Sequence, residues 1–140
     1  NEEYTTTDLK QNMKWLNEPS DKSTIDISES SLTFECDTET DFWITPELNR
    51  HSGHFYYVDN INGNFQVYVE IFGAYSTIYD QMGLMIIRDK NNWVKTGIEF
   101  IDQQHVSTVV TKQYSDWNVA PIDRNPESIE LKLTRSKAKI

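Results

Sequence analysis

A chain of 140 residues with 37% hydrophobic and 12% aromatic residues is long enough to fold around an apolar core. Its 22 acidic and 13 basic residues give a formal charge of −9, and the basic residues are scattered, which argues against nucleic acid and anionic membranes as partners. No run approaches the ~20 apolar residues of a membrane span, and residues 1–10 lack the pattern of a signal peptide.

The chain begins with a polar, Thr-rich segment that has no hydrophobic periodicity, so residues 1–12 are predicted to form a flexible arm. Residues 13–140 are predicted to form one domain. A short element is expected at residues 9–16. It ends at Trp15-Leu16-Asn17-Glu18-Pro19, because proline disfavours helical geometry in the residue before it.

From Thr24 onward, apolar residues alternate with polar ones at the period of strands that bury one face. Two such segments, 24–28 and 32–36, predict a hairpin that turns at Glu29-Ser30. Further strands, separated by polar turns, are predicted at 54–58, 64–72, 79–88, 93–101, 105–114 and 128–134. Because no amphipathic helix separates these strands, we expect antiparallel pairing and an all-β sandwich or jelly roll.

The single cysteine, Cys36, occupies an alternating position of the second hairpin strand, where a buried structural thiol is expected. One cysteine cannot form an internal disulfide, and this suits a reducing compartment. The sequence therefore predicts a soluble, cytoplasmic protein.

Two of the long strands carry an unusual polar face. Trp93, Lys95 and Glu99 stand opposite a row of core residues, and Tyr68 and Glu70 stand opposite a second row. Aromatic rings beside carboxylates and an amine suit sugar recognition, because a pyranose offers an apolar face for stacking and hydroxyls for hydrogen bonds. The alternative is that Lys95 forms cross-strand ion pairs with Glu70 or Glu99 that only solubilise the sheet.

Several motifs, in consistent order over roughly residues 15–135, resemble those of the regulation of enolase family. They are Trp15-Leu16-Asn17-Glu18-Pro19, Thr40-Asp41-Phe42-Trp43, the segments 79–85 and 93–99, Ser107-Thr108-Val109-Val110-Thr111, Ser115-Asp116-Trp117 and Leu133-Thr134-Arg135. The resemblance implies a concanavalin A-like jelly-roll sandwich of two antiparallel sheets, the fold of lectins and glucanases. It also implies a role in carbohydrate metabolism or in the control of a glycolytic enzyme such as enolase. Family members usually continue beyond the arginine-ended strand, so the resemblance further implies that C-terminal strands are missing here.

The family motifs extend the candidate site. The full set of predicted ligand-binding residues is Asp41, Trp43, Tyr68, Glu70, Asp80, Gln81, Trp93, Lys95, Glu99 and Trp117. A sugar or sugar phosphate would stack on a tryptophan while Asp80, Gln81 and Glu99 hold its hydroxyls. The alternatives are a hydrogen-bond network at a strand start for Asp80 and Gln81, and a core aromatic residue for Trp117.

Catalysis and metal binding have weaker signals. Glu70 and Glu99 are the pair of carboxylates that a glycoside hydrolase would need, but the Glu-x-Asp-x-x-Glu motif of the glucanases with this fold is absent. The spacing of His51 and His54 is compatible with zinc, yet no further ligand pattern accompanies it. Residues 59–64 are compatible with calcium, although an Asn-Gly turn explains them. The sequence therefore predicts neither a metal nor a cofactor.

Three functions remain open at this point. The first is a non-catalytic carbohydrate-related binding or regulatory module. The second is a protein-interaction regulator of a glycolytic enzyme. The third is a glycoside hydrolase or another sugar-active enzyme.

Overall fold

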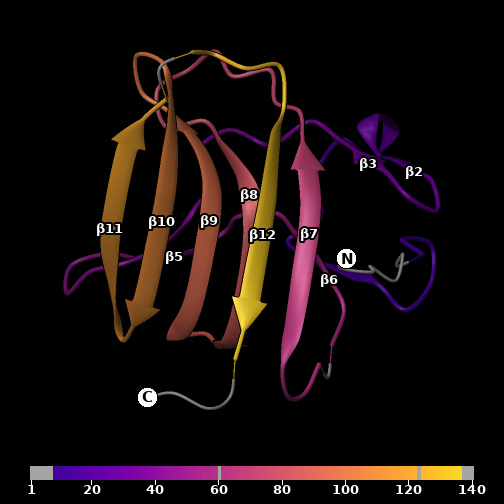
Figure 1. Cartoon of the computed structure of the whole chain (residues 1–140), viewed down its shortest axis with the longest axis horizontal. Coiled ribbons are helices and arrows are strands. Elements are labelled where there is room, and N and C mark those ends of the chain that lie inside the picture. The colour runs from indigo at the N-terminus through magenta and orange to yellow at the C-terminus, as the bar shows by residue number, and fades with distance from the viewer. Residues whose placement is uncertain (1–7, 60, 123, 137–140) are drawn as a thin grey trace. The chain divides into compact units, whose positions relative to one another are not determined.

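The computed structural model describes residues 8–59, 61–122 and 124–136, which form twelve strands and one short 3₁₀ helix (Figure 1). The predicted N-terminal arm lies largely outside the described residues. By its internal contacts, the chain divides into two compact units. The first unit contains residues 1–42 and 49–61, and the second contains residues 43–48 and 62–140. The prediction of a single domain over residues 13–140 stays a prediction.

The first unit is built from short elements. Its strands β1 (Lys14–Leu16) and β6 (Phe55–Tyr57) pair antiparallel, as do β2 (Asp26–Ile27) and β3 (Leu32–Thr33). The second pair confirms the predicted hairpin. The unit also contains the 3₁₀ helix η1 (Lys22–Thr24) and β5 (Asn49–His51). The strand β4 (Phe42–Ile44) is shared, because Phe42 belongs to the first unit and the rest of the strand to the second.

Cys36 is exposed, so the prediction of a buried thiol was wrong. The alternation of polar and apolar residues suggested that the strand continues through Cys36. In the structure, β3 ends at Thr33. Side chains alternate between two faces only within a strand, so the position of Cys36 cannot be inferred from that alternation.

Asn17, the central residue of the motif from Trp15 to Pro19, has a structural role. Its backbone has a positive φ of 58°, a conformation that asparagine tolerates better than most residues. Its side-chain amide donates hydrogen bonds to the carbonyl oxygens of His51, at 2.6 Å, and Gly53, at 2.9 Å. Gly53 itself lies against the ring of Phe42, where a Cβ atom would come within 2.5 Å of two ring carbons. Asn17 therefore ties two distant segments of the first unit together.

His54 continues this network, and its side chain is only 4% exposed. Its Nδ1 atom lies 2.6 Å from the carbonyl oxygen of Asn17, and the backbone N–H of Asp37 donates to its Nε2 atom at 2.9 Å. Since Nε2 accepts a hydrogen bond, Nδ1 carries the proton and donates to Asn17. Hydrogen bonds from Ser20 lower the pKa of the Asp37 carboxyl group.

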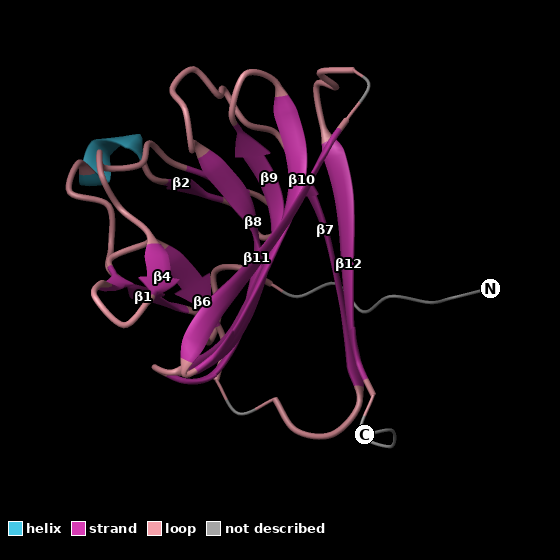
Figure 2. Cartoon of the chain, turned by 90° about the vertical axis from the view of Figure 1, so that its left-hand side faces the viewer, coloured by secondary structure: helices cyan, strands magenta, loops and turns pink. Residues whose placement is uncertain are grey.

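The second unit contains the long strands. They are β7 (Phe65–Ile71), β8 (Gln81–Asp89), β9 (Asn92–Phe100), β10 (Gln104–Lys112), β11 (Tyr114–Pro121) and β12 (Ile129–Arg135). Four of them form an antiparallel sheet in the order β11-β10-β9-β8, and β12 pairs antiparallel with β7. Figure 2 shows the β7–β12 pair as a layer beside the four-stranded sheet. The predicted all-β sandwich of antiparallel sheets is confirmed.

The sequence did not predict β11 as a separate strand. The predicted strand 105–114 instead ends at Lys112, and the chain reverses at Gln113, whose φ is 71°. The backbone N–H of Gln113 donates to the carbonyl oxygen of Asn91 at 2.8 Å, which helps to hold this turn. Because glutamine is not a typical turn residue and no glycine marks the position, the reversal could not be predicted from the sequence.

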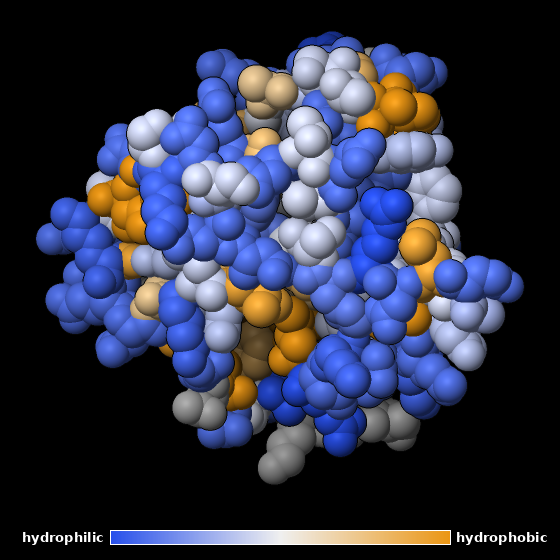
Figure 3. All heavy atoms as spheres, turned by 180° about the vertical axis from the view of Figure 1, so that it is seen from behind, coloured by the Kyte–Doolittle hydropathy of each residue, from blue (hydrophilic) through white to orange (hydrophobic). Residues whose placement is uncertain are grey.

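One face of the molecule is mainly polar. Seen from behind, it is largely hydrophilic, and the hydrophobic residues form small separate patches (Figure 3). Among the described residues, no helix has both the length and the apolar character needed to cross a membrane.

Candidate functional site

Five of the predicted ligand-binding residues share one face of the four-stranded sheet, which we call the polar sheet face. They are Gln81 on β8, Trp93, Lys95 and Glu99 on β9, and Trp117 on β11. The strand register places Gln81 opposite Glu99, and it places both Lys95 and Trp117 opposite Val109 of β10. Lys95 and Trp117 therefore lie in one row across three strands.

Hydrogen bonds fix three members of this face. The Nζ atom of Lys95 donates to Oε1 of Gln81 at 3.1 Å and lies 5.8 Å from the centre of the Trp93 ring. The indole N–H of Trp117 donates to the hydroxyl oxygen of Ser107 at 3.2 Å. Amine, amide and indole groups are thus held in defined positions, as a binding surface requires.

The members of the polar sheet face differ greatly in accessibility. Trp93 is 3% exposed and Glu99 is 5% exposed, whereas Trp117 is 40% exposed. Lys95 and Gln81 are partly exposed. A ligand that approaches this face would therefore meet Trp117 first, and Lys95 and Gln81 next.

Tyr68 and Glu70 lie elsewhere, on the exposed side of β7. In the register with β12, Tyr68 stands opposite Lys132 and Glu70 stands opposite Glu130. The hydroxyl of Ser128 donates to the Glu70 carboxylate at 2.7 Å. Glu70 is therefore on the exposed side of β7, whereas Glu99 belongs to another sheet and is 5% exposed.

Asp80 holds a loop. Its carboxylate oxygen Oδ2 accepts hydrogen bonds from the backbone N–H groups of Ser76 and Thr77, each at 2.9 Å. This arrangement matches the alternative interpretation of Asp80 as part of a hydrogen-bond network at the start of a strand. In the same segment, burial raises the pKa of the Tyr75 hydroxyl to about 12.

Asp41 and Trp43 lie outside the polar sheet face. Asp41 belongs to the first unit, where its carboxylate accepts the backbone N–H of Phe42 at 2.8 Å and its carbonyl oxygen accepts the backbone N–H of Ser52 at 2.8 Å. Trp43 is the middle residue of β4, in the second unit. Of the ten predicted residues, five therefore lie on the polar sheet face.

The metal hypotheses gain no support from the geometry. Both ring nitrogens of His54 take part in hydrogen bonds within the protein, so neither is oriented toward an ion. Within residues 8–59, 61–122 and 124–136, no three His, Cys, Asp or Glu side chains form a group that could hold a metal. Residues 59–64, which are compatible with calcium in sequence, include residue 60, which lies outside the described residues.

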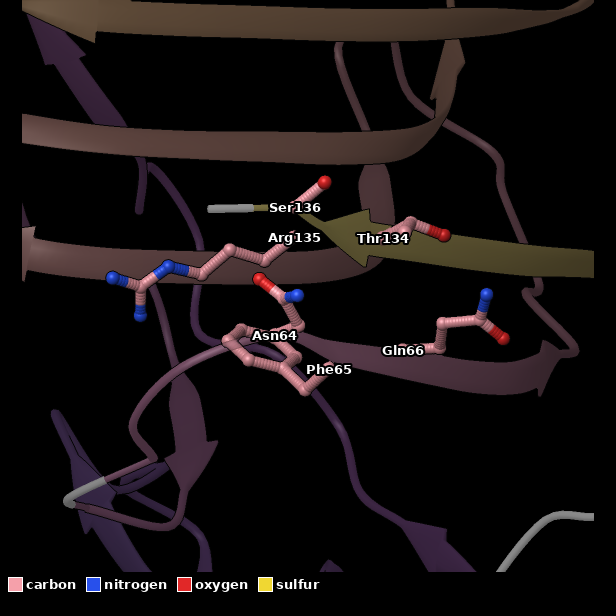
Figure 4. A pocket seen from close by; sticks show the side chains of 6 residues that line it. All are labelled: Asn64, Phe65, Gln66, Thr134, Arg135 and Ser136. Carbon is pink, nitrogen blue, oxygen red and sulfur yellow. The ribbon is translucent and has the colours of Figure 1, made fainter. Parts of the chain in front are cut away.

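A hollow of about 340 Å³ lies where β7 begins and β12 ends (Figure 4). The guanidinium group of Arg135 lies 5.8 Å from the centre of the Phe65 ring at this hollow. Figure 4 shows that Gln66 and Thr134 point away from Arg135, because neighbouring residues of a strand project to opposite faces. The lining residues therefore do not converge on one point.

Sequence reasoning missed a pair of exposed hydrophobic residues on β11, which we call the edge strip. They are Trp117, 40% exposed, and Val119, 39% exposed, and they lie on the same side of the sheet as the polar sheet face. Val106 and Val110 of β10 and Tyr114 of β11 are 43–49% exposed, but the register places them on the opposite side of the sheet. The signal that would have revealed the edge strip is the strand at residues 114–121, in which alternate side chains share a face.

These features define an all-β protein with a polar sheet face and an exposed hydrophobic edge. A model for the family described as "Protein of unknown function (DUF1349)" matches residues 15–140, and the chain belongs to this family. The chain is 37% identical over 134 residues to "Regulation of enolase protein 1" of Saccharomyces cerevisiae, and this match covers 94% of the chain and 65% of that protein. The predicted resemblance to the regulation of enolase family is therefore confirmed.

Another curated protein and a solved structure are also similar to this chain. An uncharacterized protein of Emericella nidulans is 32% identical over 117 residues, which cover 79% of this chain and 58% of that protein. The crystal structure of a functionally unknown protein from Saccharomyces cerevisiae matches with a TM-score of 0.79 and 34% identity, over 94% of this chain and 70% of that one. The chain thus spans 65% and 58% of the lengths of the two curated relatives.

Proposed function

We propose that this chain is a non-catalytic regulatory module that acts by binding a glycolytic enzyme, with enolase as the first candidate. The observation that carries the proposal is the 37% identity, over 94% of the chain, to a protein named for the regulation of enolase. Glu99, one of the two carboxylates considered for hydrolysis, is 5% exposed, and this favours binding over glycoside hydrolysis.

The edge strip supplies a surface for such a partner. Protein interfaces are enriched in tryptophan near their centres, and Trp117 lies in the strip. Trp117 is the best anchor, because Ser107 already holds its indole N–H in the free protein. Fixing the Trp117 side chain on binding therefore costs little conformational entropy.

We expect the purified chain to bind enolase and to change the rate at which enolase dehydrates 2-phosphoglycerate. Replacement of Trp117 by alanine should weaken binding by about 30-fold, the effect of losing an interfacial anchor worth about 2 kcal/mol. Biolayer interferometry with immobilised enolase measures the affinity, and a coupled spectrophotometric assay measures the rate.

The matched control is Tyr68→Ala, which removes an aromatic side chain of similar exposure, 45%, from the other sheet. It should bind enolase as the unchanged chain does. The proposal fails if the unchanged chain neither binds enolase nor alters its rate. If Tyr68→Ala and Trp117→Ala weaken binding equally, the edge strip is not the contact surface.

A second candidate function is recognition of a sugar or sugar phosphate on the polar sheet face. Two observations favour it. Gln81 holds the Lys95 amine by a hydrogen bond, and the strand register places Lys95 and the accessible ring of Trp117 in the same row, two strands apart. An amine can bind a phosphate or hydroxyl group while an indole ring stacks on the sugar.

A thermal-shift screen with glycolytic sugar phosphates tests this second function. A ligand that binds only the folded state should raise the melting temperature, and Lys95→Met should abolish the rise. Lys132→Met on β12 is the control and should keep it. A rise that persists in Lys95→Met would place the ligand elsewhere, and no rise with any compound would remove the hypothesis.

A further inference from the structure

The outer side of β11 is an unprotected sheet edge. The strand order places β11 at one end of the four-stranded sheet, and β11 has no second strand partner among the described residues. It pairs with β10 in an uninterrupted register over residues 114–121. Every second residue of such a strand directs its backbone N–H and C=O groups outward, ready to pair with another strand.

Proteins usually protect an exposed edge with bulges, lysines or an internal proline. The strand β8, at the other end of this sheet, has a bulge between Ile87 and Asp89 next to the exposed Arg88. β11 has no bulge and no basic residue, and its proline, Pro121, is its last residue. Its one charged residue is Asp116. The edge at β8 is therefore protected and the edge at β11 is not, so of these two strands only β11 is suited to pairing with another strand.

We propose that β11 pairs antiparallel with β11 of a second copy of this chain, which joins two four-stranded sheets into one continuous sheet. The two-fold axis lies perpendicular to the sheet at Asn118. This inference rests on the edge of β11. It extends the proposed function, because a dimer would cover the edge strip and so compete with the partner enzyme for that surface.

The self-complementarity of β11 selects a second copy as the occupant. With Asn118 on the axis, Trp117 of each copy faces Val119 of the other, on the same side of the sheet, and such aromatic and β-branched pairs stabilise antiparallel strands. Asp116 faces Ala120, so the two carboxylates are offset by four residues, about 13 Å along the strand. This offset exceeds the Debye length of ~8 Å at physiological salt.

Sedimentation velocity of the purified chain over a wide concentration range tests the association. We expect a monomer–dimer equilibrium that shifts toward the dimer as salt rises from low to physiological concentration, because each copy carries a charge of −9 and salt screens the repulsion. A chain that stays monomeric at all concentrations would overturn the proposal. So would a monomer whose β11 amides become protected from hydrogen exchange only when enolase is added.

The variant Asn118→Lys places two like charges on the axis and should weaken the dimer at least tenfold. Gln66→Lys adds the same charge to an exposed position of β7 and should leave the dimer unchanged. Circular dichroism verifies that both variants remain folded. A dimer that survives Asn118→Lys, or one that Gln66→Lys weakens equally, would contradict the assignment.

Cross-linking tests the register. In a Cys36→Ser background, Asn118→Cys places two thiols on the axis, where the Cα atoms of facing residues lie about 4.5–5.5 Å apart, a separation that a disulfide spans. Mild oxidation should produce a covalent dimer from Asn118→Cys and not from Asp116→Cys. The reverse result would disprove the register. Because this assay needs no enolase, its failure is distinguishable from failure of the proposed function.

Discussion

Replacement of Gly97 by alanine is expected to destabilise the four-stranded sheet by about 3 kcal/mol or more, the upper range for forcing an extra group into a packed interior. Gly97 on β9 stands opposite Gly83 on β8. A Cβ atom at Gly97 would collide with the carbonyl oxygen of Met82 and come within 2.6 Å of the Gly83 Cα atom. Both are backbone atoms, so no side-chain rotation relieves the clash.

Urea unfolding followed by tryptophan fluorescence measures this loss, because Trp93 and Trp117 report on the same sheet. Gly63→Asn is the matched control. Gly63 has a φ of 75°, which asparagine tolerates, and nothing lies within 4 Å of its added Cβ position. The control should change stability by less than about 1 kcal/mol. If Gly97→Ala unfolds at the same urea concentration as the unchanged chain, the close contact of β8 and β9 is incorrect.

Replacement of Asn17 by alanine is expected to destabilise the first unit by about 3 kcal/mol. The variant loses two hydrogen bonds to backbone carbonyl groups, worth about 1 kcal/mol each, and alanine adds about 1 kcal/mol of strain at a φ of 58°. Hydrogen exchange of amides in β1 and β6 reports on this unit directly.

Asn17→Gly separates the two contributions, because glycine adopts a positive φ without strain but lacks the amide. It should therefore lose about 2 kcal/mol, less than the alanine variant. Equal losses in both variants would show that the backbone conformation contributes nothing. A loss below about 0.5 kcal/mol in Asn17→Ala would show that the hydrogen bonds to His51 and Gly53 do not stabilise the unit.

The strands with a clear two-residue period were predictable from sequence. The segments 64–72 and 93–101 became β7 and β9 within one residue at each end, because one face of each strand carries a row of hydrophobic residues. β11 was not predictable in the same way. Its residues are mostly exposed, so no hydrophobic period marks it, and the turn at Gln113 depends on a contact with Asn91.

The candidate site was predictable only in part. Alternation along β9 placed Trp93, Lys95 and Glu99 on one face, and the structure keeps them together. The sequence could not show which strands are neighbours, so it grouped Tyr68 and Glu70 of β7 with this face. It also could not show that Trp93 and Glu99 are almost fully buried, since burial depends on what packs against a strand.

The sequence by itself determined the all-β class, the antiparallel hairpins and the family, because these follow from local periodicity, turn residues and motifs along the chain. Only the tertiary structure decided that β7 pairs with β12, that Trp117 is the accessible aromatic residue of the polar sheet face and that β11 is the last strand of its sheet among the described residues. The physical reason is that strand pairing joins residues far apart in sequence, so register and neighbouring strands fix side-chain exposure.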